Sequence, residues 1–149
     1  MLSDRARQVL ADSGWTVDRA VDPEPAQEAL RADGYGRWAD VPLALGSLLG
    51  LVVEFKRPQD GLVERFALDP ADGTSGEDPE LVADWSRRAG EPLCPIGQAF
   101  RGNMTLVLGD SGVVYAGRDD LLFAVAPTIE GAVEELTTGS LLTDKPDIP

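Results

Sequence analysis

The sequence contains no histidine and only one cysteine among its 149 residues. Without imidazole, the chain cannot form a Ser-His-Asp triad, a Cys-His dyad or a zinc site with histidine ligands. The single Cys94 cannot form a disulfide within the chain, which fits a reducing compartment. Because Cys94 stands between Leu93 and Pro95, we expect a buried structural thiol rather than a nucleophile.

Basic residues are also scarce, with 13 against 26 acidic ones and a net charge of −13. Such a surface repels nucleic-acid phosphates and anionic lipid, and it attracts basic partners. A high negative charge also keeps a protein soluble, so charge alone leaves both interpretations open.

Long apolar runs are missing as well. The longest stretch, residues 41–53, is interrupted by proline and glycine and is too short to cross a bilayer. The first ten residues lack the continuous apolar stretch of a signal peptide. We therefore expect a cytoplasmic protein that binds neither nucleic acid nor membrane and carries no cofactor.

The length and the order of the predicted elements indicate one α+β domain over residues 1–149, with a flexible tail at 143–149. Helical spacing with capping signals predicts helices at 3–13, 22–34, 38–49, 78–90 and 128–138. β-favouring runs predict strands at 51–55, 66–68, 104–108, 113–115 and 121–126, the last three as an antiparallel meander. The three tryptophans are expected to anchor the core with one polar edge each: Trp15, Trp38 and Trp85.

Two segments imitate catalytic or metal-binding motifs. Gly109-Asp110-Ser111-Gly112 has the form of a serine-protease nucleophile motif, but no general base is available and a hairpin turn explains it better. Residues 69–80 have an acid at each end, as an EF-hand loop does, yet Ala71, Gly73 and Thr74 occupy positions that need oxygen ligands and glycine. We therefore predict no catalytic residue and no metal site, with a hydrolase or metal-binding protein as a rival interpretation.

The acidic residues are concentrated between positions 60 and 84, where eight acids accompany only one basic residue, Arg65. Part of this stretch is predicted to be loop, where binding residues often lie, although any loop of an acidic protein tends to be acidic. The Asp119-Asp120 pair between two predicted strands is a second candidate patch. The partner-binding candidates are therefore Asp60, Glu64, Asp69, Asp72, Glu77, Asp78, Asp119 and Asp120.

Several strings occur in a characteristic order between residues 14 and 139. They are residues 14–19, 29–35, 50–53, Phe66-Ala67-Leu68-Asp69-Pro70, Leu93-Cys94-Pro95-Ile96-Gly97-Gln98, residues 106–115 and the closing helix at 129–139. In their order and spacing these strings resemble the SUKH superfamily, and in particular its subgroup three.

This resemblance implies a twisted, mainly antiparallel β-sheet with N-terminal helices and a C-terminal helix packed on it. Many family members are immunity proteins of bacterial polymorphic toxin systems, and no catalytic residues come with the family. They bind a cognate toxin, often a nuclease or nucleic-acid deaminase, and block it inside the producing cell. We therefore expect a protein that occludes the active site of a toxin with a basic surface. The alternative is an adaptor or regulatory scaffold with a non-toxin partner.

Overall fold

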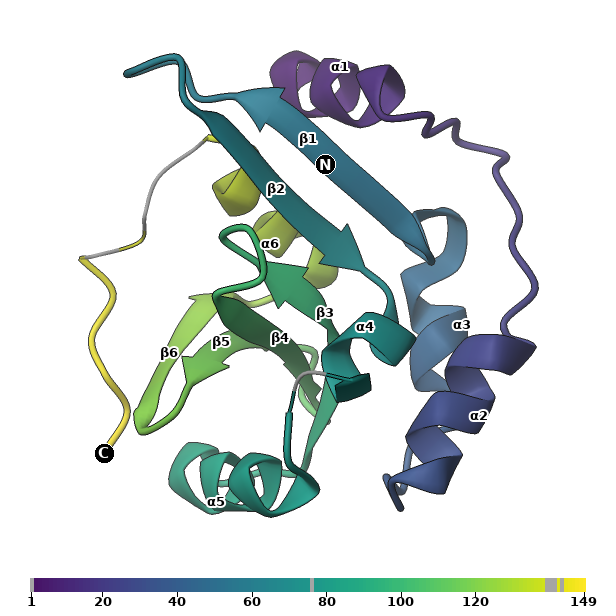
Figure 1. The fold of residues 1–149 in the computed structure, drawn as a ribbon, viewed down its shortest axis with the longest axis vertical. Coiled ribbons are helices and arrows are strands. Elements are labelled where there is room, and N and C mark those ends of the chain that lie inside the picture. Colours follow the sequence, from purple (N-terminus) through teal and green to yellow (C-terminus); the bar gives the residue numbers. More distant parts are fainter. Residues whose placement is uncertain (1, 76, 139–141, 143) are drawn as a thin grey trace.

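The computed structural model describes residues 2–75, 77–138, 142 and 144–149, which form an α+β fold (Figure 1). The helices in these residues are α1 (Asp4–Asp12), α2 (Glu24–Ala32), α3 (Val41–Leu45), the 3₁₀ helix η1 (Gly46–Leu48), α4 (Pro70–Ser75), α5 (Pro79–Ala89) and α6 (Ile129–Thr137). The strands are β1 (Leu51–Lys56), β2 (Val63–Leu68), β3 (Leu93–Ala99), β4 (Met104–Gly109), β5 (Val114–Arg118) and β6 (Leu121–Ala126). Neighbouring strands are antiparallel and follow one another in chain order, so the predicted fold class is confirmed.

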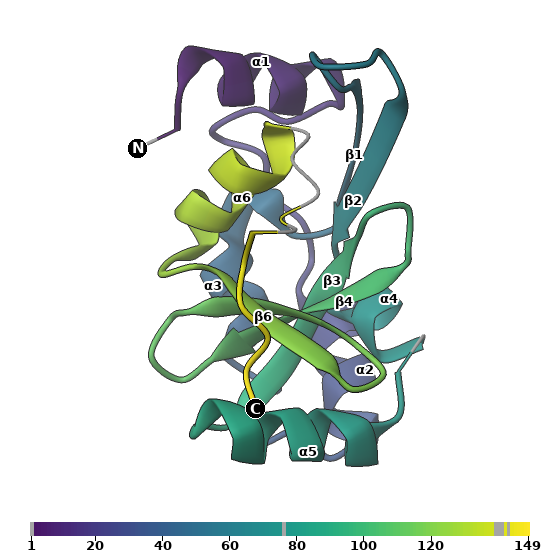
Figure 2. The same ribbon diagram turned by 90° about the vertical axis from the view of Figure 1, so that its left-hand side faces the viewer.

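Strands β3 to β5 are buried on both faces, whereas alternate residues of β1 are exposed. Alternate residues of the last three strands enter two different cores. Successive side chains on a strand point to opposite faces, so a two-residue period divides them. The main core lies against α1, α2, α3 and α6 and includes Leu106, Leu108, Val114, Ala116, Phe123 and Val125. The second core lies under α5 and contains Val82, Trp85, Leu93, Val107, Tyr115 and Leu122. Figure 2 shows α5 at the end of the molecule opposite to α1 and α6.

Trp85 is the central side chain of the second core. Its side chain is fully buried, and its indole Nε1 donates a hydrogen bond to the backbone oxygen of Asp119 at 2.9 Å. The ring packs over Gly117, where an added Cβ would lie only 2.7 Å from ring atoms. This contact fixes α5 to β5 and to the turn between β5 and β6.

Strand β3 and helix α4 are not predicted from the sequence. No strand is predicted at 93–99, where Pro95 lacks the N–H group that a central strand uses. Two features of the sheet accommodate this proline. A bulge interrupts the pairing of β3 with β4 between Pro95 and Gly97, and β2 pairs with β3 only through Ala67 and Gln98. Helix α4 packs against β3 and lies in a segment that is predicted to be irregular.

Two further segments differ from expectation. The helix predicted at 38–49 is shorter and divided, because Gly46 adopts a left-handed φ of +56° between α3 and η1. Residues 144–149, where a flexible tail is predicted, lie against β6. The backbone N–H of Ile148 donates a hydrogen bond to the backbone oxygen of Leu122, and the backbone N–H of Leu122 donates one to the carboxylate of Asp147. An edge strand has unpaired backbone groups, and these bonds satisfy some of them. The glycine expected to end the last helix, Gly139, lies outside the described residues.

The contact between Trp85 and Gly117 predicts that Gly117→Ala destabilises the fold by about 1–3 kcal/mol, because the buried ring has no space to move. Gly36→Ala is a matched control, since a Cβ there would meet no atom within 4 Å. The measurement is urea unfolding of both variants and the wild type. Equal free energies of unfolding for all three proteins would contradict the predicted packing.

Candidate functional site

The candidates on the β1–β2 hairpin, Asp60 and Glu64, have different environments. Asp60 is exposed at the turn and accepts a 3.1 Å hydrogen bond from Arg57, whose guanidinium lowers the pKa of this carboxyl. Glu64 is only 3% exposed, and its Oε2 lies 3.2 Å from Nη1 of Arg101 and 3.8 Å from Nη1 of Arg57. Glu64 is therefore an internal ion-pair partner and has almost no surface to offer another protein.

Four candidates lie around α4 and the start of α5. Asp69 is half-buried, and its Oδ1 accepts a 3.0 Å hydrogen bond from the backbone N–H of Ala71. Asp72 is half-buried in the first turn of α4. Glu77 is half-buried and accepts a hydrogen bond from the hydroxyl of Thr105 at 2.9 Å. Asp78 is exposed and caps α5. The segment that imitates an EF-hand loop is therefore the helix α4 followed by the beginning of α5.

The last two candidates, Asp119 and Asp120, form the exposed turn between β5 and β6. Asp119 adopts a left-handed φ of +51°, which aspartate tolerates better than most residues. Its backbone oxygen accepts the hydrogen bond from the Trp85 indole, so this turn lies beside α5.

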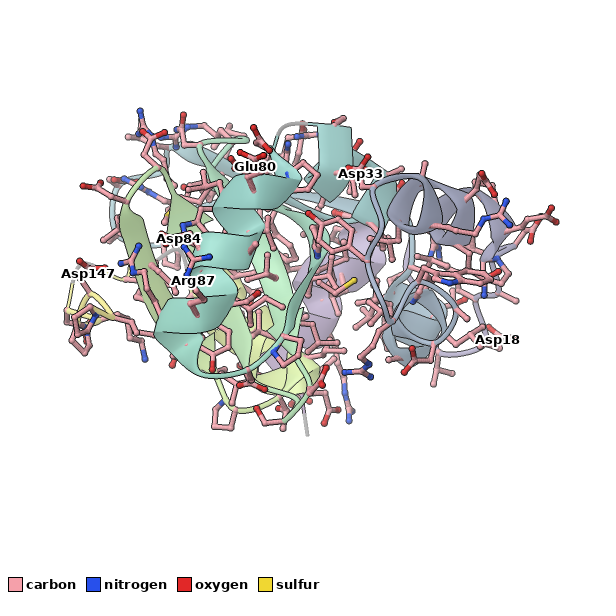
Figure 3. The ribbon with its side chains drawn as sticks, turned by 90° about the horizontal axis from the view of Figure 1, so that it is seen from below. Asp18, Asp33, Glu80, Asp84, Arg87 and Asp147 are labelled. Carbon is pink, nitrogen blue, oxygen red and sulfur yellow. The ribbon has the colours of Figure 1, made fainter. Side chains whose placement is uncertain are left out.

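The candidates thus fall into three places rather than one patch. The turn with Asp60 lies at the end of the molecule opposite to α5, as Figures 1 and 2 both show. The α4–α5 junction and the β5–β6 turn both adjoin α5. Seen from below in Figure 3, α5 carries the exposed Glu80 and the ion pair of Asp84 with Arg87, and Asp33 lies beside the start of this helix.

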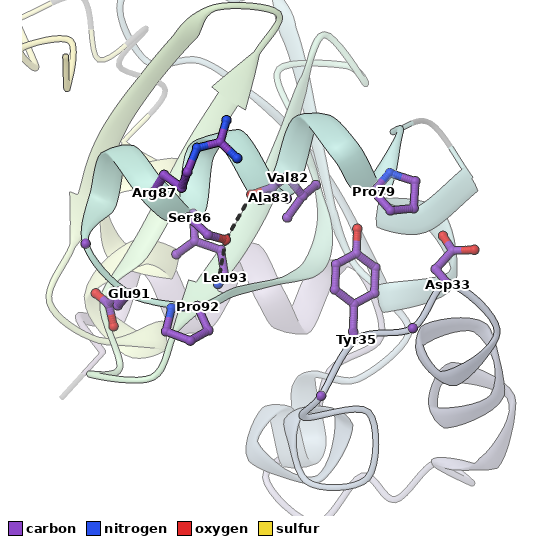
Figure 4. A pocket seen from close by; sticks show the side chains of 13 residues that line it. Asp33, Tyr35, Pro79, Val82, Ala83, Ser86, Arg87, Glu91, Pro92 and Leu93 are labelled. Carbon is purple, nitrogen blue, oxygen red and sulfur yellow. Dashed lines mark hydrogen bonds between the residues drawn. The ribbon is translucent and has the colours of Figure 1, made fainter.

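A groove with a volume of about 570 Å³ separates α5 from the loop after α2 (Figure 4). Its apolar lining includes Tyr35, Val82 and Leu93, and carboxylates stand at Asp33 and Glu91. The hydroxyl of Ser86 fixes the α5 wall, because it donates to the oxygen of Val82 and accepts from the N–H of Leu93. This groove is not predictable from the sequence, because no spacing rule connects the loop after α2 with α5. Only the packing of the folded chain brings these two segments together.

The groove lining carries two carboxylates, Asp33 and Glu91, and one guanidinium, Arg87. Burial raises the pKa of Tyr35, and the nearby charge of Asp33 raises it further, so the phenol stays neutral. Its hydroxyl is buried and has no hydrogen-bond partner within the part of the chain that the structure describes. A smaller cavity next to the groove is lined by Cys94, whose pKa burial raises to about 12. The thiol is therefore protonated at neutral pH and buried, as expected for a structural cysteine.

Glu91 joins the α5 end of the groove to the turn between β4 and β5. Its carboxylate accepts hydrogen bonds from the backbone N–H of Ser111 at 2.7 Å, the hydroxyl of Ser111 at 2.8 Å and the hydroxyl of Tyr115 at 2.7 Å. Burial acts to raise the pKa of Glu91, but these bonds together hold it below its ordinary value. The segment 109–112 is the predicted hairpin turn, and Ser111 is a structural donor in it.

The arrangement around the groove is suited to binding. Within the described ranges, no group of three or more Cys, Asp or Glu side chains is placed to hold a metal ion. None of the helices in these ranges has the length and apolar character that crossing a membrane requires. What the site offers is an apolar groove with exposed carboxylates around it.

Comparison with known proteins gives one family match. The model of a family described as SUKH-3 immunity protein matches residues 2–139, nearly the whole chain. No curated protein and no solved structure matches the chain.

The bonds at Glu91 predict that Glu91→Gln lowers the free energy of unfolding by about 1–3 kcal/mol at pH 7. Because the folded-state pKa is depressed, this stabilisation is present above the unfolded pKa of about 4.3 and is lost as the pH falls through the folded pKa. The measurement is unfolding at pH values between 7 and 3. The control Glu54→Gln, at an exposed site, should change the free energy of unfolding little. If the wild type were still more stable than Glu91→Gln by the same amount at pH 3, the role of the Glu91 carboxylate would be contradicted.

Proposed function

This chain belongs to the SUKH-3 immunity protein family, and we propose that it neutralises a cognate bacterial toxin by binding over the toxin's active site. Membership of an immunity protein family implies a toxin as partner, and such families are generally non-enzymatic. We propose further that the toxin is a nuclease or nucleic-acid deaminase with a basic surface, and that binding takes place in the cytoplasm of the producing cell.

The observation that supports this proposal is the exposed carboxylate surface around α5. Enzymes that act on nucleic acids hold phosphates with basic clefts, and a protein with a net charge of −13 presents the complementary sign. The proposed contact residues lie around α4, at the start of α5 and in the β5–β6 turn: Asp69, Asp72, Glu77, Asp78, Asp119 and Asp120. Asp60 lies at the opposite end, and Glu64 is left out of the proposed contact because it is buried in an ion pair.

Occlusion needs no chemical step from the immunity protein. Attraction between the carboxylates and basic side chains of the toxin accelerates encounter, and close packing across the interface then excludes the nucleic-acid substrate. The apolar groove beside these acids can receive part of the toxin surface, which adds burial of apolar area to the electrostatic attraction.

The direct test is binding of the purified chain to the toxin domains encoded by genes adjacent to its own. We expect a complex that abolishes toxin activity and whose dissociation constant rises about tenfold or more between 50 and 500 mM salt. Calorimetry at the two salt concentrations measures this, together with an activity assay of the toxin. Absence of binding to every neighbouring toxin at low salt would refute the proposed function.

The location of the acidic contact is tested by reversing two of its charges. We expect Asp72→Lys with Asp120→Lys to slow association with the toxin about tenfold at low salt, because steering depends on local charge. The control pair is Asp12→Lys with Glu54→Lys, two exposed acids on α1 and β1 that change the net charge by the same amount. Stopped-flow kinetics measures the rates. Equal slowing by both pairs would show that total charge, not this surface, controls association.

A further inference from the structure

Large apolar side chains are unusually exposed in the segment between α1 and α3. Of the eight exposed large apolar residues found in the described part of the chain, four belong to this segment: Val17, Val21, Trp38 and Leu43. Val17 is 83% exposed and Leu43 is 60% exposed, and both line one cavity of about 370 Å³ together with Val21. Isolated exposed apolar residues are ordinary, but a contiguous group marks an interaction surface.

The loop that carries Val17 is held in place on both sides. On one side, the indole Nε1 of Trp15 donates to the hydroxyl of Ser47 at 3.0 Å. On the other side, Nη1 of Arg19 donates to the backbone oxygens of Ser47 and Leu49 at 2.8 and 2.6 Å. These bonds fix the loop to η1 while Val17 stays exposed between them. A side chain presented by a fixed loop loses little conformational entropy on binding.

Hollows with apolar lining lie on both sides of Val17. The cavity shared with Leu43 is on one side, and a second cavity of about 680 Å³, lined by Trp15, Leu45 and Leu48, also includes Val17. A raised apolar residue between two hollows resembles the centre of an interface, where burial contributes most to affinity. We call the exposed residues Val17, Val21 and Leu43 the Val17 surface.

The charges around the Val17 surface select a basic partner. Exposed carboxylates adjoin it at Asp18, Asp22 and Glu24, and a fourth, Glu28, is paired with Arg31. Of the nearby guanidinium groups, Arg19 binds backbone oxygens, Arg31 pairs with Glu28 and lies 5.5 Å above the Trp38 ring, and Arg7 lines the second cavity beside Val17. A second copy of this chain would bring the same acids and a net charge of −13. Charge therefore disfavours a dimer through this face and favours a partner with lysine or arginine beside an apolar side chain.

We infer that the Val17 surface is a second contact for the toxin, and that it receives a segment with an apolar side chain flanked by basic residues. This inference rests on the proposed function. Figure 3 shows Asp33 between α5 and the more distant Asp18, so one partner can span the acidic surface and the Val17 surface across the loop after α2. The acidic surface mainly accelerates encounter, whereas the Val17 surface prolongs the complex by apolar burial.

The test uses the wild-type chain, the neighbouring toxin domain and two double variants of identical composition. Val17→Asn with Leu43→Asn removes the apolar contact without changing charge. Leu62→Asn with Val63→Asn removes the same two side-chain types from the exposed β1–β2 hairpin at the other end of the molecule. We expect the first variant to weaken binding about tenfold or more through faster dissociation, and the control to stay within about twofold. Thermal melting verifies that both variants are folded.

The outcomes separate this inference from the proposed function. If the wild type binds the toxin and the first variant binds it with the same affinity, the Val17 contact is refuted and the immunity function is not affected. Failure of the wild type itself to bind any neighbouring toxin would overturn both. A dimer of the free chain in analytical ultracentrifugation, abolished by Val17→Asn with Leu43→Asn, would assign this surface to a second copy and overturn the inference.

Discussion

The packing of Trp85 over Gly117 is the contact on which the α5 end of the molecule depends. It attaches α5 to the second face of the sheet, and the indole hydrogen bond fixes the β5–β6 turn beside the same helix. The groove between α5 and the loop after α2, the acids of the α4–α5 junction and the Asp119-Asp120 pair all take their places from this attachment. One buried aromatic side chain thus brings together carboxylates that are about forty residues apart in the sequence.

The acidic residues divide into those that maintain the fold and those that face the solvent. Glu64 is paired with the buried Arg57 and the half-exposed Arg101, and Glu91 accepts three hydrogen bonds that close the β4–β5 turn. Asp78 does both, because it caps α5 while remaining exposed. Carboxylates that are satisfied within the chain contribute little to attraction of a partner, since their charge is already compensated. A steering field would therefore come from the exposed remainder, of which Asp78, Glu80, Asp119 and Asp120 adjoin α5.

A tight inhibitor needs both fast encounter and slow dissociation, and different parts of this surface suit these two requirements. Charge acts over about 8–10 Å at physiological salt and mainly changes the association rate. Apolar side chains act only in contact and mainly change the dissociation rate. The acidic surface around α5 has the first character, and the Val17 surface, held by Trp15 and Arg19, has the second. This division would let salt change the speed of recognition while the complex, once formed, persists.

Local chemistry determined much of this protein directly from its sequence. The caps at Ser3, Asp78 and Thr128 begin helices where the sequence predicts them, because a side-chain oxygen satisfies a backbone N–H within two or three residues. The order of its strings identified the family. Tertiary structure alone decided what depends on distant partners. Pro95 lies in a central strand because β2 barely pairs with it, Glu64 is buried because two arginines neutralise it, and the groove and the Val17 surface exist because separate segments pack together. Composition and periodicity record which residues can be buried or charged, but the neighbours of each side chain are fixed only when the chain folds.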